Sequence, residues 1–254
     1  MQTNALTSII QLIQINQLAF ERKFLPYSVA LLQAYTLRHA QNLNRYTFLP
    51  ILFERLPLQE NVQESLIADI AAFSTYVWNM QYSLAMAKQL KEKKPQIVTI
   101  FGGPHVPDRA EQFLRDNPQV DICCHGEGES VFLEILEHLP QKNWENIAGV
   151  SFLNSEGVFI HQARSPRRKN LDTIPSPYLL GIFDPLLKIH PHYRWTAPWE
   201  TNRGCPFSCT FCDWGSATAA KVNRFGLERL QAEINWFAEH KIDMVYCCDA
   251  NFGI

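Results

Sequence analysis

Short, almost wholly apolar segments alternate with amphipathic segments through the first 145 residues of the chain. Residues 6–15, 46–53, 70–74, 97–101 and 120–124 are predicted strands, and residues 27–40, 63–69, 79–93, 108–116 and 129–139 are predicted helices. Strands that are apolar along their whole length, with helices between them, are typical of a parallel sheet buried on both faces. The sequence therefore predicts an α/β fold in which residues 1–145 form a doubly wound parallel sheet of the Rossmann or flavodoxin-like kind.

The pattern changes after residue 145. Residues 150–152 and 158–160 flank Asn-Ser-Glu-Gly at 154–157, which predicts a β-hairpin. Residues 161–198 contain six prolines and few periodic runs, so residues 146–197 are interpreted as a hairpin followed by a proline-rich linker or wrapping segment. A second α/β unit is expected over 198–254, in the order strand 198–202, cysteine-rich loop, helix 227–240 and strand 244–248.

Composition narrows the class of protein. Hydrophobic residues make up 46% of the 254 residues, which is enough for packed cores and argues against disorder. The net charge of −2 argues against a nucleic-acid partner, and the short basic cluster at 164–169 (RSPRRK) is interpreted as a solvated linker. We find no signal peptide and no stretch near the ~18 apolar residues of a membrane span. A cytoplasmic location is expected, where seven cysteines are metal ligands or core residues rather than disulfides.

The stretch TNRGCPFSCTFCDWG, residues 201–215, places Cys205, Cys209 and Cys212 close together in a segment of loop composition. A structural zinc site would need a fourth ligand, which Cys247 or Cys248 at the end of the last predicted strand could supply. A disulfide is disfavoured by the expected compartment. Three thiolates also suit an iron–sulfur cluster, in which one of four irons would lack a protein ligand.

The spacing Cys-x3-Cys-x2-Cys after the first strand of a βα unit, with Phe211 before the third cysteine, resembles the signature of the radical S-adenosylmethionine (SAM) enzymes. The resemblance implies that Cys205, Cys209 and Cys212 hold a 4Fe-4S cluster whose open iron binds S-adenosylmethionine. It also implies electron transfer to that ligand, formation of a 5′-deoxyadenosyl radical, and a partial (β/α) barrel whose first two βα units are residues 198–254.

Two further positions follow from this resemblance. Phe211 is expected to pack near the adenine of S-adenosylmethionine, although ordinary core packing would explain an aromatic residue equally well. The family's Gly-Gly-Glu pattern at the end of the second strand is absent, and Asp249 and Asn251 stand there instead. Asp249 is therefore a candidate S-adenosylmethionine contact, with a strand-capping role as the alternative.

Three turns follow predicted strands of the first domain. They are FSTYVWN at 73–79, IFGGPHVP at 100–107 and VDICCHGEGES at 120–130. In open α/β sheets, ligands bind outside the carboxyl ends of the strands, where glycines allow close approach and hydroxyls offer hydrogen bonds. Each turn alone could be an ordinary strand-to-helix connection, but three together predict a binding edge. The candidate residues are Ser74, Thr75, Tyr76, Gly102, Gly103, His105, Gly126, Glu127 and Gly128.

A doubly wound domain before a radical module resembles the cobalamin (vitamin B12)-binding radical S-adenosylmethionine proteins, over nearly the whole chain. The resemblance implies that the three turns bind cobalamin. One departure is clear: the Asp-x-His-x-x-Gly pattern that supplies a cobalt ligand is absent, since residues 16–27 contain no histidine. His105 is better interpreted as a turn histidine, so the resemblance implies cobalt without a protein lower ligand.

The function implied by this resemblance is methyl transfer to an unactivated carbon or phosphorus of a small-molecule or peptide substrate. An external flavodoxin- or ferredoxin-like protein would supply electrons. A cobalamin-dependent cyclisation or rearrangement and a non-catalytic cobalamin-binding protein are the alternatives. A radical methylthiotransferase is disfavoured, because the first domain offers only the adjacent Cys123 and Cys124 for a second cluster. Since a radical barrel needs several more strands, we expect the 254 residues to be a fragment of a longer protein.

Overall fold

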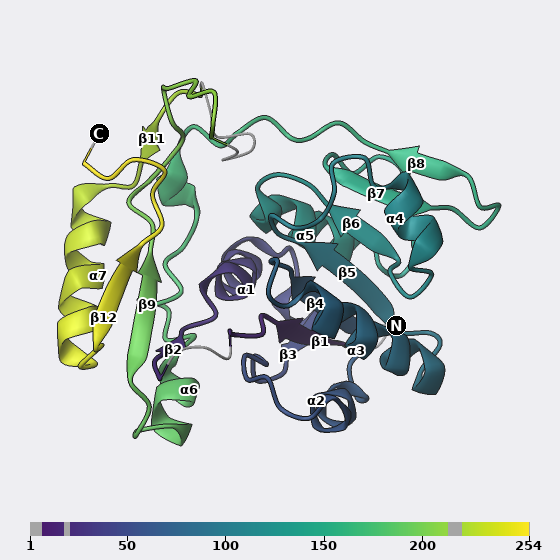
Figure 1. Ribbon diagram of the computed structural model, residues 1–254, viewed down its shortest axis with the longest axis horizontal. Coiled ribbons are helices and arrows are strands. Elements are labelled where there is room, and N and C mark those ends of the chain that lie inside the picture. The colour runs from purple at the N-terminus through teal and green to yellow at the C-terminus, as the bar shows by residue number, and fades with distance from the viewer. Residues whose placement is uncertain (1–6, 18–20, 213–219, 254) are drawn as a thin grey trace.

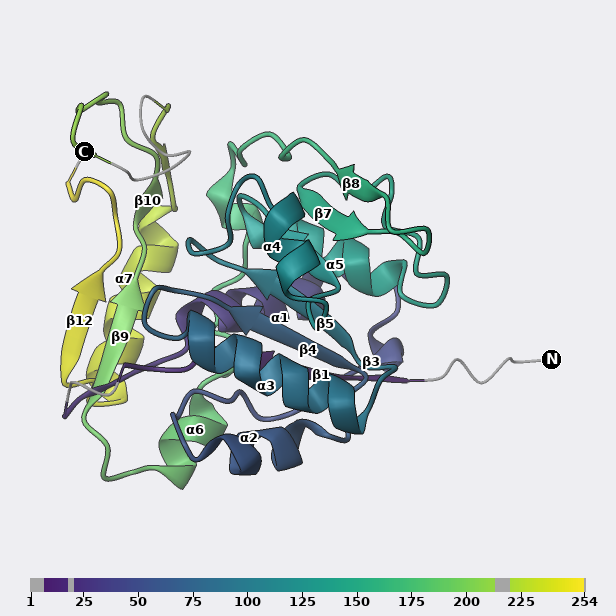
Figure 2. The same ribbon diagram turned by 45° about the vertical axis from the view of Figure 1, so that its right-hand side comes forward.

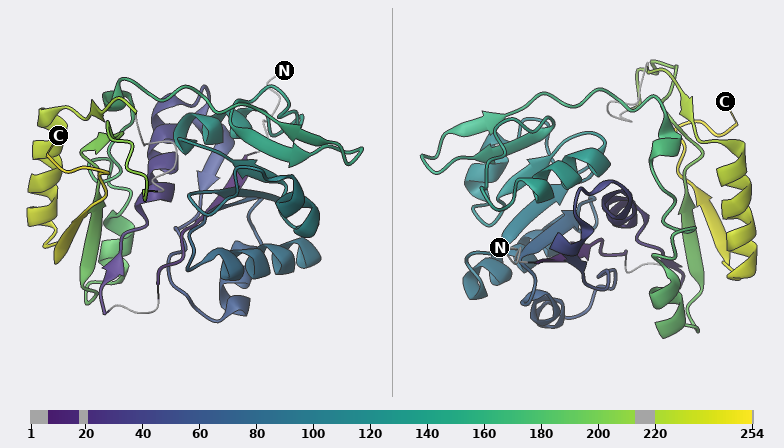
Figure 3. Two further views of the ribbon diagram at one scale, coloured as in Figure 1. Left: turned by 45° about the horizontal axis from the view of Figure 1, so that its top comes forward. Right: turned by 180° about the vertical axis from the view of Figure 1, so that it is seen from behind.

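The computed structural model describes residues 7–17, 21–212 and 220–253. A large sheet flanked by helices occupies one side, and a smaller sheet backed by helix α7 stands beside it (Figure 1). The chain between them runs from β8 across the top of the first unit, as the views in Figure 3 show. No helix among the described residues is long and apolar enough to span a bilayer.

The large sheet has the strand order β3–β1–β4–β5–β6–β7–β8. The strands are β1 (Ser8–Ile13), β3 (Tyr46–Phe48), β4 (Ile70–Ser74), β5 (Val98–Gly102), β6 (Ile122–Cys124), β7 (Val150–Leu153) and β8 (Phe159–His161). Strands β3 through β6 of this order run parallel. Numbered along the chain, these parallel strands read 2-1-3-4-5, which is the flavodoxin-like order. The predicted doubly wound fold is confirmed.

Helices cover both faces of this sheet. They are α1 (Tyr27–His39), α2 (Leu58–Ser65), α3 (Met80–Lys93), α4 (Glu111–Asp116) and α5 (Gly128–Glu137). Every residue of β4 is buried: Ile70 and Ala72 join the core with α1 and α5, whereas Ala71 and Phe73 join the core with α2, α3 and α4. Successive strand side chains point to opposite faces, so an entirely apolar strand serves both cores.

The hairpin belongs to this sheet, whereas the sequence interpretation grouped it with the linker at 146–197, outside the first domain. Strand β7 pairs antiparallel with β6, and β8 pairs antiparallel with β7. The short antiparallel pair therefore forms one edge of an otherwise parallel sheet, an arrangement common in doubly wound folds. Helix α2 also differs from its prediction at 63–69, because it begins after Pro57, where the fixed backbone angle of proline suits a helix start.

The smaller sheet has the order β12–β9–β2, and all its pairs are parallel. Its strands are β9 (Trp195–Trp199), β12 (Met244–Cys247) and β2 (Lys23–Phe24). Helix α7 (Leu227–Glu239) backs it, while β10 (Asn202–Arg203) pairs with β11 (Asn223–Arg224). The observed β9 begins before the predicted 198–202. Strand β2 was missed, because two residues are too few to show a period of two.

The proline-rich segment is part of the core. It contains the turn η2 (Leu171–Thr173) and helix α6 (Asp184–Ile189). Another short turn, η1 (Leu43–Arg45), lies outside this segment, before β3 of the first sheet. The side chain of Tyr178 is fully buried, stacks on Tyr27 of α1 at 5.6 Å, and meets Trp236 of α7 at 5.0 Å. The wrapping segment thus joins the two sheets through one continuous hydrophobic core.

Candidate cofactor site

The carboxyl ends of β4 and β5 are joined by a tight backbone contact. The backbone N–H and the hydroxyl of Thr75 both donate to the carbonyl of Gly102, at 2.7 and 2.8 Å. The N–H of His105 donates to the carbonyl of Thr75 at 3.2 Å. Gly103 lies between them with φ +102°, and a Cβ there would come within 2.6 Å of the Thr75 carbonyl oxygen. Only glycine fits this position without moving the backbone.

Replacing Gly103 with alanine is expected to lower the free energy of unfolding by about 3 kcal/mol, from positive-φ strain plus the clash with Thr75. Gly157→Ala is the matched control, because Gly157 also has positive φ but has open space around its Cβ position. That control is expected to lose only about 1 kcal/mol. Urea unfolding of both variants measures the difference, and equal losses would contradict the steric argument.

The structure divides the predicted residues of these two turns into buried and accessible ones. Thr75 is fully buried and its hydroxyl donates to the chain itself, so it shapes the turn. The hydroxyl of Tyr76 lies 2.7 Å from the hydroxyl of Ser28, and its ring stacks on Trp78 at 4.5 Å. His105 is exposed. Sequence reasoning missed the accessible apolar side chains, Val77 and Trp78, which are 72% and 39% exposed.

Asn79 is a second residue that the sequence interpretation missed. Its buried side-chain amide donates to the carbonyls of Ile15, after β1, and Ser74, at the end of β4, at 3.1 and 3.0 Å. Its oxygen accepts the N–H of Tyr76 at 2.7 Å. β1 and β4 meet at the switch point of the sheet, where ligands of this fold bind. An asparagine just before a helix was the available signal, since such residues commonly bond to nearby backbone.

The third turn, residues 126–129, is held by the basic segment 164–169. The Glu127 carboxylate accepts the backbone N–H of Arg168 at 3.0 Å and lies 3.7 Å from the Arg167 guanidinium. The Arg168 guanidinium packs over the ring of Tyr35 at 5.0 Å. The interpretation of this segment as a solvated linker is wrong for Arg167 and Arg168, which face Glu127 and Tyr35, whereas Arg164 and Lys169 are exposed. Gly126 is exposed with φ +83°, and Gly128 begins α5.

A buried ion-pair cluster joins this turn to the second unit. The Arg203 guanidinium contacts Glu129 at 2.6 Å, Glu200 at 3.0 Å and Glu127 at 3.9 Å. Burial acts to raise the pKa of Glu129, but the charge and hydrogen bond of Arg203 outweigh it and hold that pKa below its usual value. Burial raises the pKa of Glu200. Sequence analysis missed this cluster because its members lie up to 76 positions apart, Glu127 to Arg203.

The cysteine loop is closed by the antiparallel pairing of β10 with β11. Cys205 is buried, whereas Cys209 and Cys212 are exposed. The carbonyl of Cys205 accepts the N–H of Ala220 at 2.8 Å, and its sulfur accepts the side-chain amide of Asn251 at 2.9 Å. The loop thus anchors one thiol and leaves two accessible.

The donor set of this loop fits an iron–sulfur cluster. Its ligating side chains within residues 204–212 are thiols alone, which iron–sulfur clusters prefer. In the part of the chain that the structure describes, no three His, Cys, Asp or Glu side chains are already gathered to hold a metal ion. The three thiols would therefore have to converge as a cluster binds. The entry to the loop requires glycine at position 204, since φ is +116° and a Cβ would lie 2.5 Å from the Lys221 carbonyl oxygen.

The two residues predicted to contact S-adenosylmethionine lie in different surroundings. The Asp249 carboxylate accepts the backbone N–H groups of Thr201 and Asn202, at 2.7 and 3.1 Å, and the Asn202 side-chain amide at 3.0 Å. These bonds tie the end of β12 to the end of β9, as expected of a strand cap. Phe211 is 89% exposed and lies beside the cysteines.

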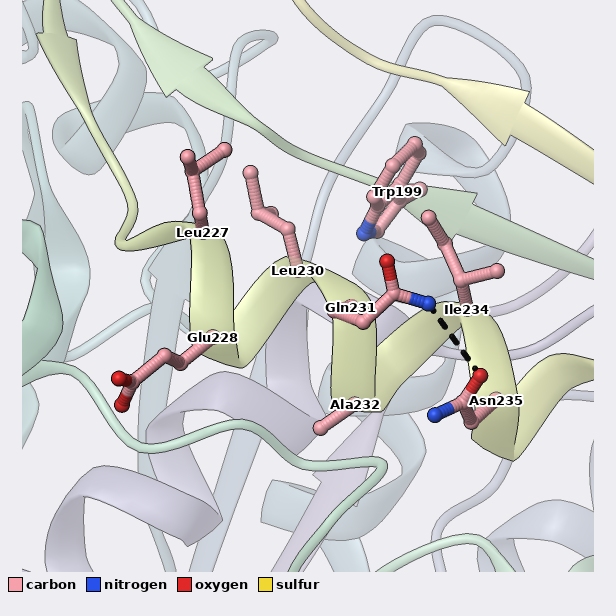
Figure 4. A pocket seen from close by; sticks show the side chains of 8 residues that line it. All are labelled: Trp199, Leu227, Glu228, Leu230, Gln231, Ala232, Ile234 and Asn235. Atoms are coloured by element: carbon pink, nitrogen blue, oxygen red, sulfur yellow. Dashed lines mark hydrogen bonds between the residues drawn. The ribbon is translucent and has the colours of Figure 1, made fainter.

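A separate cavity lies between α7 and Trp199 at the end of β9 (Figure 4). Its volume is about 710 Å³. It does not include the cysteine loop or the three turns of the first sheet, and its walls are Trp199, Leu227, Glu228, Leu230, Gln231, Ala232, Ile234 and Asn235. The candidate site is instead the region where the carboxyl ends of the first sheet face the second unit (Figure 2).

Comparisons with known proteins agree with this geometry. The B12 binding domain family matches residues 55–136, which include all three turns. The chain is 40% identical over 238 residues to the cobalamin-dependent radical SAM methyltransferase TokK of Streptomyces tokunonensis, covering 92% of this chain and 35% of that protein. It is 43% identical over 237 residues to a 2-(S-pantetheinyl)-carbapenam-3-carboxylate methyltransferase of Streptantibioticus cattleyicolor, covering 91% and 34%.

A solved structure shares the fold. The cobalamin-dependent S-adenosylmethionine radical enzyme OxsB matches with a TM-score of 0.75 at 17% identity, over 97% of this chain and 34% of that one. The chain thus spans about a third of the length of the proteins it matches. The resemblance inferred from the cysteine spacing and the three turns is confirmed: the chain belongs to the cobalamin-binding radical S-adenosylmethionine proteins.

Proposed function

We propose that this chain carries the cobalamin and cluster sites of a cobalamin-dependent radical S-adenosylmethionine methyltransferase that acts on an unactivated carbon or phosphorus of a small-molecule or peptide substrate. The observation that carries the proposal is the direct contact of Arg203, two residues before Cys205, with Glu129 in the turn at the first sheet's carboxyl edge. This contact supports a proposal in which the two cofactor regions lie side by side. Methyl transfer is favoured over cyclisation, rearrangement or a non-catalytic role because the two relatives described above are methyltransferases.

The residues of the chain divide between two cofactors. The cluster would supply an electron to S-adenosylmethionine, and cobalamin would supply the methyl group. Cys205, Cys209 and Cys212 would hold the cluster, with the Asn251 amide directed at the Cys205 sulfur. Hydrogen bonds to cluster sulfurs raise reduction potentials, so this amide favours electron uptake.

The first sheet would hold cobalamin at its carboxyl edge. Gly103 brings exposed backbone to this edge beside the half-buried Gly102, and Val77 and Trp78 give it apolar surface. Ser74, Thr75 and Tyr76 would support the turn beneath, while Gly126, Glu127 and Gly128 would flank the same edge. At this edge the imidazole of His105 is exposed, whereas His125, directly after β6, is buried.

We propose a revised division into units. The cobalamin unit would span residues 1–161, with the connecting segment after it, and the pairing of the hairpin with β6 supports this division. The βα units from β9 onward take β2 as a neighbour.

All seven cysteines are free, which supports the proposal of a cytoplasmic protein reduced by a flavodoxin- or ferredoxin-like donor.

Retention of hydroxocobalamin after desalting tests the first site, with corrin absorbance as the readout. We expect about one corrin per chain for the unaltered protein, and about tenfold weaker binding for Val77→Asp, because a carboxylate at this exposed edge would be desolvated by the macrocycle. Val158→Asp is the matched control, since Val158 is 50% exposed in the hairpin turn. Unaltered protein without corrin absorbance would refute the proposal, and equal weakening by both variants would refute the assigned edge.

A further inference from the structure

Arg203 stands between the two proposed cofactor sites. It belongs to β10 and is followed directly by Gly204 and Cys205. Its guanidinium lies 2.6 Å from Glu129 of the first unit and 3.0 Å from Glu200 of the second. One side chain thus touches both the turn after β6 and the segment that leads into the cysteine loop.

These ion pairs are shielded from water. The side chains of Arg203, Glu129 and Glu200 are 11%, 5% and 19% exposed, whereas the surface pair Arg115–Glu111 is 44% and 52% exposed. Shielded, hydrogen-bonded charges hold their partners in a defined geometry far better than surface pairs do. The cluster around Arg203 therefore fixes the separation between the turn and the strand.

The backbone after Arg203 is tied to the segment opposite. The backbone of Gly204 packs so closely that an added Cβ would lie 2.5 Å from the Lys221 carbonyl oxygen, and the N–H of Ala220 donates to the Cys205 carbonyl at 2.8 Å. Arg203 itself, in β10, pairs with Asn223 of β11. A shift of the guanidinium is therefore passed to Cys205 instead of being lost in a flexible loop.

We propose that Arg203 is a positioning residue that couples the cobalamin edge to the cysteine loop, so that filling either site strengthens binding at the other. This inference rests on the proposed function. A corrin packed against the turn at 126–129 would contact the segment that carries Glu127 and Glu129, and a displacement of these carboxylates would reach the base of the cysteine loop through Arg203. Such coupling is reciprocal by thermodynamic necessity.

The test measures the dissociation constant of hydroxocobalamin by absorbance titration, on chain with and without a reconstituted cluster. For the unaltered chain we expect binding to tighten ~10-fold when the cluster is present. For Arg203→Met we expect the same constant in both states, and for Arg203→Lys a partial return of the difference. A merely structural role would weaken binding in both states and leave their ratio unchanged.

Glu129→Gln is a second variant that keeps the shape of the side chain while removing one ion-pair partner, and it is expected to reduce the same ratio. Arg115→Met serves as the control and should keep the full ratio. The ratio compared is the dissociation constant without the cluster divided by that with it. A ratio near one for the unaltered chain overturns the coupling, as does an unreduced ratio in folded Arg203→Met and Glu129→Gln. Either result leaves the proposed function standing. Absence of corrin binding in every state refutes the proposed function, and with it this inference.

Discussion

Replacing Cys205, Cys209 and Cys212 together with alanine is expected to abolish iron binding, from about four irons per anaerobically reconstituted chain to background. The three thiols are the ligating side chains of the loop closed by β10 and β11, and no other group in the described residues is arranged to replace them. Colorimetric iron and sulfide analysis, together with loss of the brown absorbance of the reconstituted protein, measures the effect.

The matched control is the double variant Cys247→Ala/Cys248→Ala, which removes thiols of the same type at the end of β12. Burial raises the pKa of Cys248 to about 12, so it stays protonated and is a poor ligand. The control is expected to keep its iron. If it loses iron as the triple variant does, a four-cysteine site is the better description, and if the triple variant keeps iron, the cluster assignment fails.

Replacing Tyr178 with alanine is expected to lower the free energy of unfolding by about 4 kcal/mol. Its ring is fully buried among aromatic side chains from α1, the connecting segment and α7, and its hydroxyl donates to the carbonyl of Pro198 in β9. Removing the ring would leave a cavity where both sheets meet the connecting segment. Urea unfolding followed by circular dichroism measures the loss.

Tyr178→Phe separates the two contributions. It keeps the ring and removes only the hydroxyl, so we expect a loss of about 1 kcal/mol. A loss below about 1 kcal/mol for the alanine variant would show that the connecting segment is not a shared part of the core. Separate unfolding transitions for the two sheets in the unaltered chain would contradict the continuous core directly.

Strands buried on both faces were the most predictable part of the fold. β4 matches its prediction at 70–74, because five consecutive apolar or small residues can be buried only in the interior of a covered sheet. Helices α1 and α3 also lie within a residue of their predicted ranges at 27–40 and 79–93. Elements of two or three residues, such as β2 and β10, carry no periodic signal and depend on partners distant in the chain.

The candidate site was predictable only in part. The turns and the cysteine loop could be found because glycines and closely spaced thiols are local features. The local sequence did not indicate which side chains of these turns face outward. Thr75 is buried by the approach of Gly103, while Val77 and Trp78 remain accessible. The role of Arg203 was invisible because its partners at positions 127 and 129 come from another unit.

By itself the sequence determined the doubly wound first sheet, its three candidate turns and the family to which the cysteine spacing points. These follow from short-range patterns, namely apolar runs, glycines after strands and thiol spacing. Only the tertiary structure decided that the hairpin forms an edge of the first sheet, that the segment 164–169 holds the acidic turn, and that Arg203 bridges the two sites. Those features depend on ion pairs and strand pairs between residues distant in the chain, which form only when the chain folds, so no local sequence pattern predicts them.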